Sequence, residues 1–189
     1  MLELPAHVSR IVLIGLMGAG KTTVGRLIAD RLQWKFIDLD AAIEERAGIT
    51  VSRIFAERGE KAFRSLEEQL TGELASSHHV VLAPGGGWIT SAQAVSRVPE
   101  DSAVFWLKVS PEEAVRRVQN DDVERPLLNR AGGALAAARE LAGQRNAKYE
   151  LHGIAVETEN RAPDEIVTEI LSKLGDRQVM TRDRMESNG

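Results

Sequence analysis

Residues 15–23, which read GLMGAGKTT, decide the fold of this chain. An unbroken apolar run at residues 11–14 precedes them, as expected of a strand buried on both faces, and apolar residues at helical spacing follow them. In such a loop the glycines let backbone N–H groups surround a phosphate chain, Lys21 neutralises phosphate oxygens, and Thr22 offers a hydroxyl to Mg²⁺. The stretch therefore predicts a phosphate-binding loop for a nucleoside triphosphate, formed by Gly18, Ala19, Gly20, Lys21, Thr22 and Thr23.

Strand and helix patterns alternate along the rest of the chain. Strands are expected at residues 11–14, 35–37, 80–83, 103–107 and 154–156. Helices are expected at residues 24–32, 41–47, 51–58, 60–75, 91–98, 111–119, 134–149 and 163–174. This alternation predicts an α/β fold in which helices flank a five-stranded parallel sheet.

The composition limits the function. The 189 residues, 43% of them hydrophobic, suit one α/β domain. A net charge of -4, from 24 Lys and Arg against 28 Asp and Glu, argues against a nucleic-acid-binding or membrane-binding surface and favours small-molecule partners. The chain has no cysteine and no apolar run near the roughly 20 residues that span a bilayer. Because its first residues show no signal-peptide pattern either, we expect a cytoplasmic protein.

The chemistry is expected where the strands end. Ligands of open parallel sheets bind beyond the carboxyl ends of the strands. Lys21, the two aspartates that follow the second strand and the glycines at 85–87 should therefore surround one crevice. Those aspartates, Asp38 and Asp40, are separated by one residue, and strand alternation would direct both side chains to the same side. One could hold Mg²⁺ while the other accepts the proton of an acceptor hydroxyl; alternatively, both only cap the helix expected from Ala41.

Missing motifs narrow the reaction. No Asp or Glu ends the strands expected at 80–83 and 103–107, so the usual Walker-B carboxylate is absent there, and no NKxD motif for guanine occurs. The metal carboxylate must then come from Asp38 or Asp40, which places the metal beside the acceptor. This arrangement favours a small-molecule kinase over a motor ATPase or a GTPase switch.

Three arginines could supply the cations of such a site. Arg64 lies in an expected helix, Arg125 in an irregular polar segment at residues 120–133, and Arg145 in the next helix. A hydroxy-acid or phosphate acceptor needs bidentate cations, and a loop arginine can close on the γ-phosphate once ATP is bound. For each arginine taken alone, however, a solvated surface role is the more common one.

Seven segments, in this order, resemble the shikimate kinase family. They are GLMGAGKTT (15–23), FIDLD (36–40), GEKAFRSLEE (59–68), the glycines at 85–87, ERPLL (124–128), QRNAKY (144–149) and TENRAP (158–163). The resemblance implies a three-layer fold like that of P-loop nucleoside-monophosphate kinases. It also implies transfer of the γ-phosphoryl group of ATP, with Mg²⁺, to the 3-hydroxyl of shikimate, on the route to chorismate and the aromatic amino acids.

The resemblance also implies how the chain is divided. A single kinase domain would cover residues 1–174, with a substrate-binding helical segment at about 41–75 and a mobile lid at about 120–133. Residues 175–189, which are polar and lack periodicity, would form a disordered tail. A monomer is the expectation that follows from the family.

On the acceptor side, the resemblance assigns five residues. Asp40 matches the aspartate that takes the proton of the substrate hydroxyl. Arg64 and Arg145 match the arginines that hold the shikimate carboxylate, and Gly86 matches the residue that offers the substrate a backbone N–H. Glu67 matches a carboxylate that orients Arg64 from one helical turn away.

On the nucleotide side, Thr22 and Asp38 match the Mg²⁺ site of the family. Lys21 matches the lysine on the phosphates, and Arg125 matches a lid arginine that reaches them. The adenine-side residues would be Arg161 and either Arg117 or its neighbour Arg116.

The chain departs from the family pattern at a few positions, and none of these departures removes a catalytic group. Val118 stands where the family commonly has an arginine stacked on adenine, and Trp88 follows the glycines where many members have a smaller residue.

Two other functions remain as alternatives. Another small-molecule kinase, for gluconate or a nucleoside monophosphate, would use the same loop without the set of Asp40, Arg64 and Arg145. A non-catalytic nucleotide-binding module would need neither a base nor a lid arginine.

Overall fold

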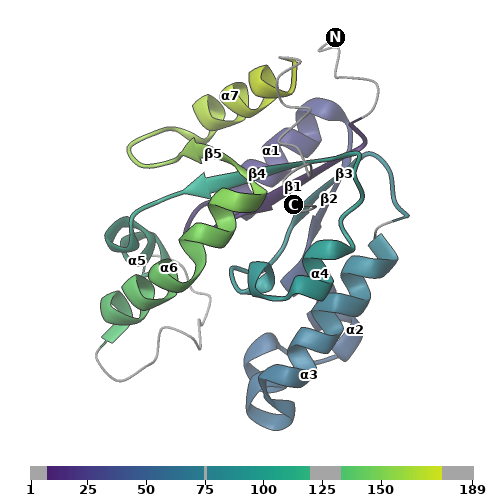
Figure 1. Cartoon of the computed structure of the whole chain (residues 1–189), viewed down its shortest axis with the longest axis vertical. Coiled ribbons are helices and arrows are strands. Elements are labelled where there is room, and N and C mark those ends of the chain that lie inside the picture. Colours follow the sequence, from purple (N-terminus) through teal and green to yellow (C-terminus); the bar gives the residue numbers. More distant parts are fainter. Residues whose placement is uncertain (1–7, 75, 120–132, 176–189) are drawn as a thin grey trace, which may run out of the picture.

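The computed structural model describes residues 8–74, 76–119 and 133–175, and Figure 1 shows a sheet covered by helices. The strands are β1 (Arg10–Ile14), β2 (Lys35–Asp38), β3 (Val80–Ala83), β4 (Ser102–Lys108) and β5 (Ile154–Glu157). They lie in the order β2-β3-β1-β4-β5, and every neighbouring pair is parallel. The expected α/β fold with a five-stranded parallel sheet is therefore confirmed.

The helices occur close to where the sequence predicts them. They are α1 (Lys21–Leu32), α2 (Leu39–Ala47), α3 (Val51–Leu74), the short 3-10 helix η1 (Trp88–Thr90), α4 (Ala92–Ser96), α5 (Pro111–Gln119), α6 (Gly133–His152) and α7 (Pro163–Gly175). Helix α1 packs against α7, whereas α6 packs against β4 and η1. Figure 1 shows α6 in front of the sheet and α1 behind it, so the sheet is the middle of three layers.

The central strand β1 leads directly into the phosphate-binding loop. All its residues are buried, because β3 and β4 flank it and helices cover both faces. In the loop, Gly18 has a φ of 73°, and a Cβ on it would lie 2.4 Å from the carbonyl oxygen of Ala114 in α5. Only glycine fits this position, so the loop packs tightly against α5.

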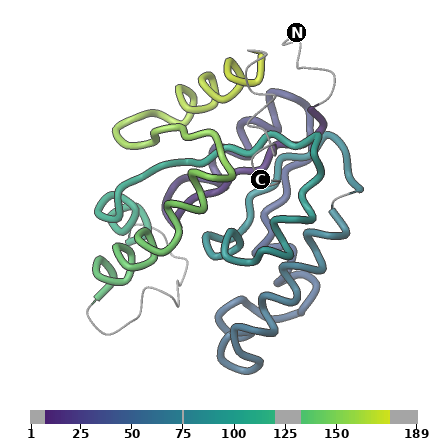
Figure 2. The backbone as a smooth tube through the Cα atoms, in the orientation of Figure 1, coloured from purple at the N-terminus to yellow at the C-terminus, as the bar shows by residue number. Residues whose placement is uncertain are grey.

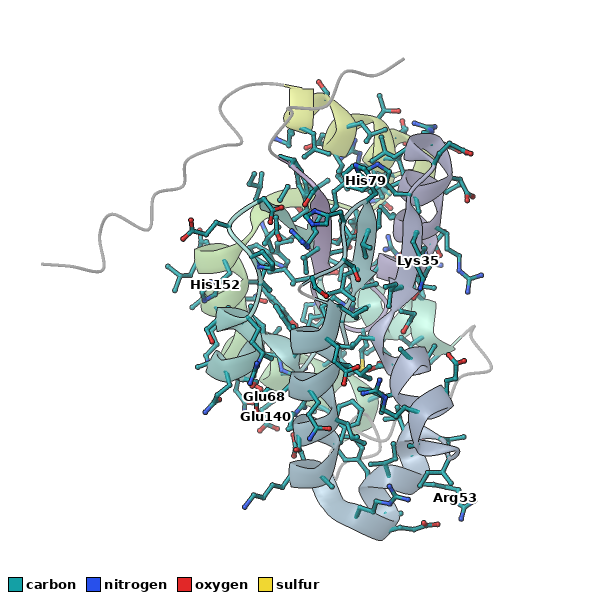
Figure 3. The ribbon with its side chains drawn as sticks, turned by 90° about the vertical axis from the view of Figure 1, so that its right-hand side faces the viewer. Lys35, Arg53, Glu68, His79, Glu140 and His152 are labelled. Atoms are coloured by element: carbon teal, nitrogen blue, oxygen red, sulfur yellow. The ribbon has the colours of Figure 1, made fainter. Side chains whose placement is uncertain are left out.

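Helix α3 contains the break that the sequence predicts. Gly59 has a φ of 79° and a ψ of 169°, which are not helical values, so two helices meet there. The part of α3 before the break adjoins α2, and Figure 2 shows both extending away from the sheet. Figure 3 places Arg53 at the far end of this extension, whereas His79, just before β3, lies near the other end of the molecule.

The expected alternation of Asp38 and Asp40 along a strand is wrong. Strand β2 ends at Asp38 and α2 begins at Leu39, so Asp40 lies in the first turn of a helix. Asp38 is the N-cap of α2, because its Oδ1 accepts a hydrogen bond of 3.3 Å from the backbone N–H of Ala41. The capping interpretation is thus confirmed for Asp38, which adds to its possible chemistry and does not replace it.

Two predicted segments lie almost entirely outside the described residues. They are the lid at 120–133, which includes Arg125, and the tail at 175–189; Gly133 begins α6 and Gly175 ends α7. Within the described ranges, none of the helices combines the length and the apolar character that crossing a membrane would need.

Candidate active site

The phosphate-binding loop brings two positive features together. Lys21 donates hydrogen bonds from Nζ to the carbonyl oxygens of Gly15 and Leu16, both at 2.9 Å. Gly20 precedes α1 as its N-cap, so the positive end of the helix dipole opens onto the loop. An ammonium group and a helix N-terminus that face the same space form an arrangement that binds phosphate.

A cavity of about 400 Å³ adjoins this loop. Its volume is in the range that is usual for small-molecule sites. The loop and α1 enclose it on one side, and α5 and the start of α7 on the other. The predicted nucleotide-binding residues that line it are Ala19, Gly20, Thr23, Arg117 and Arg161. A nucleoside could therefore extend from the loop into this cavity.

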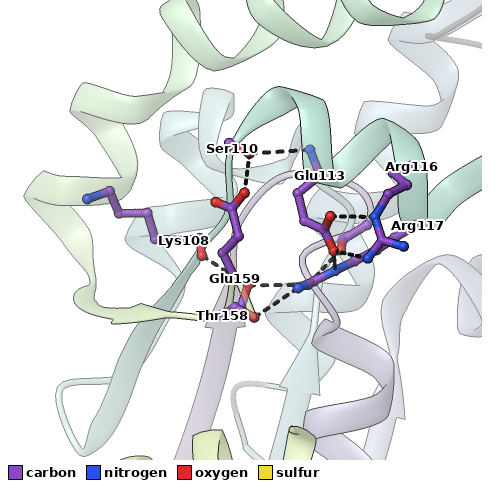
Figure 4. Close-up of polar contacts among 8 residues, drawn as sticks. Lys108, Ser110, Glu113, Arg116, Arg117, Thr158 and Glu159 are labelled. Carbon is purple, nitrogen blue, oxygen red and sulfur yellow. Dashed lines mark hydrogen bonds and ion pairs between the residues drawn. The ribbon is translucent and has the colours of Figure 1, made fainter. Parts of the chain in front are cut away.

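The contacts of Arg116 and Arg117 differ, as Figure 4 shows. Arg117 donates to the carbonyl oxygen of Thr158 at 2.8 Å and to that of Gly18, in the phosphate-binding loop, at 3.4 Å. Arg116 pairs with Glu113, and its side chain is 68% exposed. Hydrogen bonds from Arg116, and then from Arg117, lower the pKa of Glu113 to about 2. Arg117 is thus the arginine that is tied to the loop.

Arg161 reaches the cavity from the opposite side. Its Nη1 donates to the carbonyl oxygen of Glu157 at 3.0 Å and pairs with the carboxylate of Glu169 in α7. These contacts fix the guanidinium between the end of β5 and α7. The two predicted adenine-side arginines therefore border one cavity, each with a position set by backbone carbonyls.

Thr22 and Asp38 meet where the loop faces the end of β2. The hydroxyl of Thr22 donates to Oδ2 of Asp38 at 2.8 Å, while Oδ1 of the same carboxylate caps α2. A hydroxyl and a carboxylate oxygen are the hard ligands that Mg²⁺ prefers, and Mg²⁺ usually binds one or two carboxylates together with phosphates of the substrate. The pair therefore fits a magnesium ion that is bound together with the phosphates of the nucleotide.

The acceptor residues converge on the Gly85–Gly87 turn after β3, and each glycine faces a different one. A Cβ on Gly85 would lie 2.7 Å from Oδ1 of Asp40, and a Cβ on Gly87 would lie 2.3 Å from Nη2 of Arg64. A Cβ on Gly86 would lie 3.6 Å from Nη1 of Arg145. The polar ends of Asp40, Arg64 and Arg145 therefore all lie close to the backbone of this turn.

Glu67 is a carboxylate close to both Arg64 and Arg145. It is fully buried and pairs with Arg64, which also contacts Glu60 at 3.0 Å. Burial raises the pKa of Glu67 to about 7, although Arg64 opposes the shift; nearby Asp40 raises the pKa further and Arg145 lowers it. The pairing of Arg64 with Glu67 that the family resemblance implies is confirmed.

This buried carboxylate makes the stability of the protein depend on pH. Because folding raises the pKa of Glu67 from 4.5 to about 7, its contribution to stability is complete below pH 4.5 and is lost as the pH rises through 7. Glu67→Gln does not titrate, so the Tm of the variant minus that of the wild type should increase by about 4–8 °C between pH 5 and pH 8. Thermal unfolding of both proteins across this pH range measures the difference in Tm. If the two plots of Tm against pH are parallel, burial does not raise the pKa of Glu67 as described.

Arg145 is the most enclosed cation of the site. It is 5% exposed, and its Nε and Nη1 find no hydrogen-bond acceptor among the residues that the structure describes. A buried guanidinium with N–H groups to spare is suited to an incoming carboxylate, which it can bind through two parallel hydrogen bonds. Arg145 lies in α6 and Arg64 in α3, so two separate helices supply the two cations.

Two further residues of the site were not predicted as functional. Trp88 is 1% exposed and donates from Nε1 to the hydroxyl of Thr71 in α3 at 3.0 Å, so it packs against that helix. Tyr149 donates from its hydroxyl to the carbonyl oxygen of Gly86 at 2.5 Å. The only sequence signal for Tyr149 is its place at the end of the QRNAKY segment.

Comparison with known proteins gives a consistent result. The family model described as shikimate kinase matches residues 17–175. The chain is 40% identical to the shikimate kinase of Moorella thermoacetica over 87% of this chain and 93% of that one. It is 36% identical to the shikimate kinase of Persephonella marina over 87% of this chain and 98% of that one.

Solved structures point the same way. The shikimate kinase of Acinetobacter baumannii, solved in complex with shikimate, matches with a TM-score of 0.82 and 36% identity, over 87% of this chain and 92% of that one. A gluconokinase of Sinorhizobium meliloti matches with a TM-score of 0.58 and 20% identity, over 90% of this chain and 93% of that one. The second likeness shows the shared fold alone.

Proposed function

The chain belongs to the shikimate kinase family and transfers the γ-phosphoryl group of ATP to the 3-hydroxyl of shikimate, and we propose that Asp40, Lys21 and Arg125 carry out this step. One observation supports this proposal most strongly. Asp40, Arg64 and Arg145 all lie against the Gly85–Gly87 turn, and this turn lies next to the phosphate-binding loop. A Cβ on Gly86 would lie 3.3 Å from both the carbonyl oxygen of Gly15 and the backbone nitrogen of Met17. The acceptor and the triphosphate are therefore neighbours.

The acceptor would be held by two arginines and by a backbone N–H group. The carboxylate of shikimate would bind Arg145 and Arg64, and the backbone N–H of Gly86 would contact the substrate. The spare N–H groups of the buried Arg145 support this assignment. With its carboxylate fixed there, the substrate would present a hydroxyl to Asp40, which faces the same turn. Positioning of this kind supplies much of the rate in phosphoryl transfer.

Asp40 would accept the proton of the 3-hydroxyl as the oxygen attacks the γ-phosphorus. The new O–P bond forms as the bond to the bridging oxygen of ADP breaks. Lys21 would neutralise charge on the phosphate oxygens, and Arg125, which lies outside the described residues, would add a second cation when the lid closes. The products are shikimate 3-phosphate and ADP.

For the metal, we propose Thr22 and Asp38 as the protein ligands of Mg²⁺. Their oxygens lie 2.8 Å apart at the mouth of the loop, which supports the assignment. When bound, the ion would neutralise the β- and γ-phosphates. On the nucleoside side, Arg117 and Arg161 would line the adenine cavity.

Arg125→Ala tests the lid. Because a lid arginine acts on the transferring phosphoryl group, the variant should lose about 10³-fold in kcat while the KM for shikimate changes less than threefold. Steady-state kinetics with saturating Mg-ATP measure both values, and Arg130→Ala in the same segment is a matched control. Intact turnover with only a raised shikimate KM would show that the arginine serves the acceptor instead.

The choice of acceptor is tested by ADP release in a coupled assay. Mg-ATP is supplied with shikimate, gluconate, AMP or no acceptor in parallel. We expect release that depends on shikimate. Release with gluconate or AMP would keep the phosphate-binding loop and reject the arginine assignments, and ATP binding without any release would favour a nucleotide-binding module.

The remaining assignments concern the whole chain. We propose that residues 1–174 form one kinase domain, that the protein acts as a monomer, and that it works in the cytoplasm, where ATP is available. The family match over residues 17–175 supports the first. Light scattering of the purified protein would measure its mass and test the second.

A further inference from the structure

Tyr149 is buried in the acceptor site and has no role in the reaction as described above. It is 1% exposed, and its hydroxyl donates to the carbonyl oxygen of Gly86 at 2.5 Å. Its ring stacks on Trp106 of β4, with centroids 5.9 Å apart and planes inclined by 25°. The ring is therefore held by its contact with β4, while the hydroxyl forms a hydrogen bond with the turn after β3.

The bond orients two residues of the turn at once. The carbonyl of Gly86 lies in the rigid peptide plane that joins Gly86 to Gly87, so holding this oxygen also sets the direction of the next N–H. Gly86 faces Arg145, and Gly87 faces Arg64. A rotation of this one plane would move backbone atoms against both cations that are proposed to hold the substrate carboxylate.

The position of Tyr149 on α6 links the turn to Arg145. The two residues are four apart in the helix, so their side chains lie on the same face. One helix thus presents a substrate-binding cation and, one turn later, the group that fixes the backbone beside it. Burial raises the pKa of Tyr149 to about 12, so the hydroxyl stays protonated and remains a donor under working conditions.

From this geometry we propose that Tyr149 is a positioning residue for the acceptor. Its hydroxyl holds the peptide between Gly86 and Gly87 so that the turn, Arg64 and Arg145 form one preorganised carboxylate site. The nucleotide cavity has no part in this contact, because neither Tyr149 nor the Gly85–Gly87 turn lines it. The inference rests on the proposed function of the site.

Tyr149→Phe tests the role, since it removes one oxygen and keeps the ring. The carbonyl of Gly86 then loses its donor and the peptide plane is released. We expect the KM for shikimate to rise about tenfold, whereas the KM for ATP stays within twofold. A structural defect alone would affect both substrates. Shikimate binding by calorimetry in the absence of ATP should weaken by the same factor.

Ile170→Val is a matched control for stability. Ile170 is fully buried in α7 and lies outside the cavity lining, so its shortening should lower the Tm and leave the KM for shikimate unchanged. Three outcomes overturn the proposal: an unchanged shikimate KM in Tyr149→Phe, an equal rise in both KM values, or the same rise in Ile170→Val. A wild-type protein without shikimate-dependent turnover would instead reject the proposed function itself, and this inference with it.

Discussion

Asp40→Asn should lower kcat for shikimate phosphorylation by about 10²–10⁴-fold, which is the contribution usual for a general base in phosphoryl transfer. The amide has nearly the same shape but accepts no proton. Because Asp40 lies in the first turn of α2, against Gly85, the substitution leaves the phosphate-binding loop in place. ATP binding, measured by equilibrium fluorescence or calorimetry, should therefore stay within about threefold of the wild type.

Asp38→Asn is the matched control for this experiment. It changes the neighbouring carboxylate, which contacts Thr22 at 2.8 Å and caps α2. We expect it to raise the Mg²⁺ concentration that half-maximal activity requires and to leave the Tm close to that of the wild type, because Asn caps a helix about as well as Asp does. Normal turnover by Asp40→Asn would reject Asp40 as the base. Equal kinetic defects in both variants would reject the assignment of different roles to Asp40, as the base, and Asp38, as the metal ligand.

Arg145→Met should weaken shikimate binding by about 10²-fold or more. The side chain is 5% exposed and keeps two nitrogens without acceptors in the described part of the chain, so the substrate carboxylate would be its main ionic partner. Removing one member of a buried, hydrogen-bonded charge pair costs about 2–5 kcal/mol. Calorimetric titration with shikimate measures the effect directly.

Arg139→Met controls for the loss of an arginine from the same helix. Arg139 lies on the exposed side of α6, pairs with Glu112 and is 63% exposed. Its removal should change shikimate binding less than twofold, because surface ion pairs contribute little. Similar losses in Arg145→Met and Arg139→Met would mean that the defect comes from α6 as a whole and that the carboxylate binds elsewhere.

The sequence predicted what depends on local pattern. The apolar run of β1, the glycines of the loop and Lys21 occur within a few residues of one another, so their joint structure follows from neighbouring residues. The rule that ligands bind at the carboxyl ends of parallel strands then placed Asp38 beside this loop. Its contact with Thr22, sixteen residues earlier, bears this out.

Other features depend on tertiary packing and could not be predicted from the residues alone. The strand argument for Asp40 was wrong because the helix capped by Asp38 begins at Leu39, two residues before the expected start at Ala41. Arg116 and Arg117 are adjacent and alike in sequence, and their tertiary contacts distinguish them, because only Arg117 is seen to donate to the carbonyl oxygens of Thr158 and Gly18 in the described residues. Tyr149 meets Gly86 across 63 residues, a contact that no local pattern encodes.

Phosphorus NMR of the reaction products tests the central claim most directly. Purified protein is incubated with ATP, Mg²⁺ and shikimate until ADP accumulates, and the new signals are assigned. We predict a phosphate monoester whose phosphorus couples to the ring proton at carbon 3, in an amount equal to the ADP formed. A spectrum that contains only ADP and inorganic phosphate, or an ester at another hydroxyl, would contradict the placement of the acceptor between Asp40, Arg64 and Arg145.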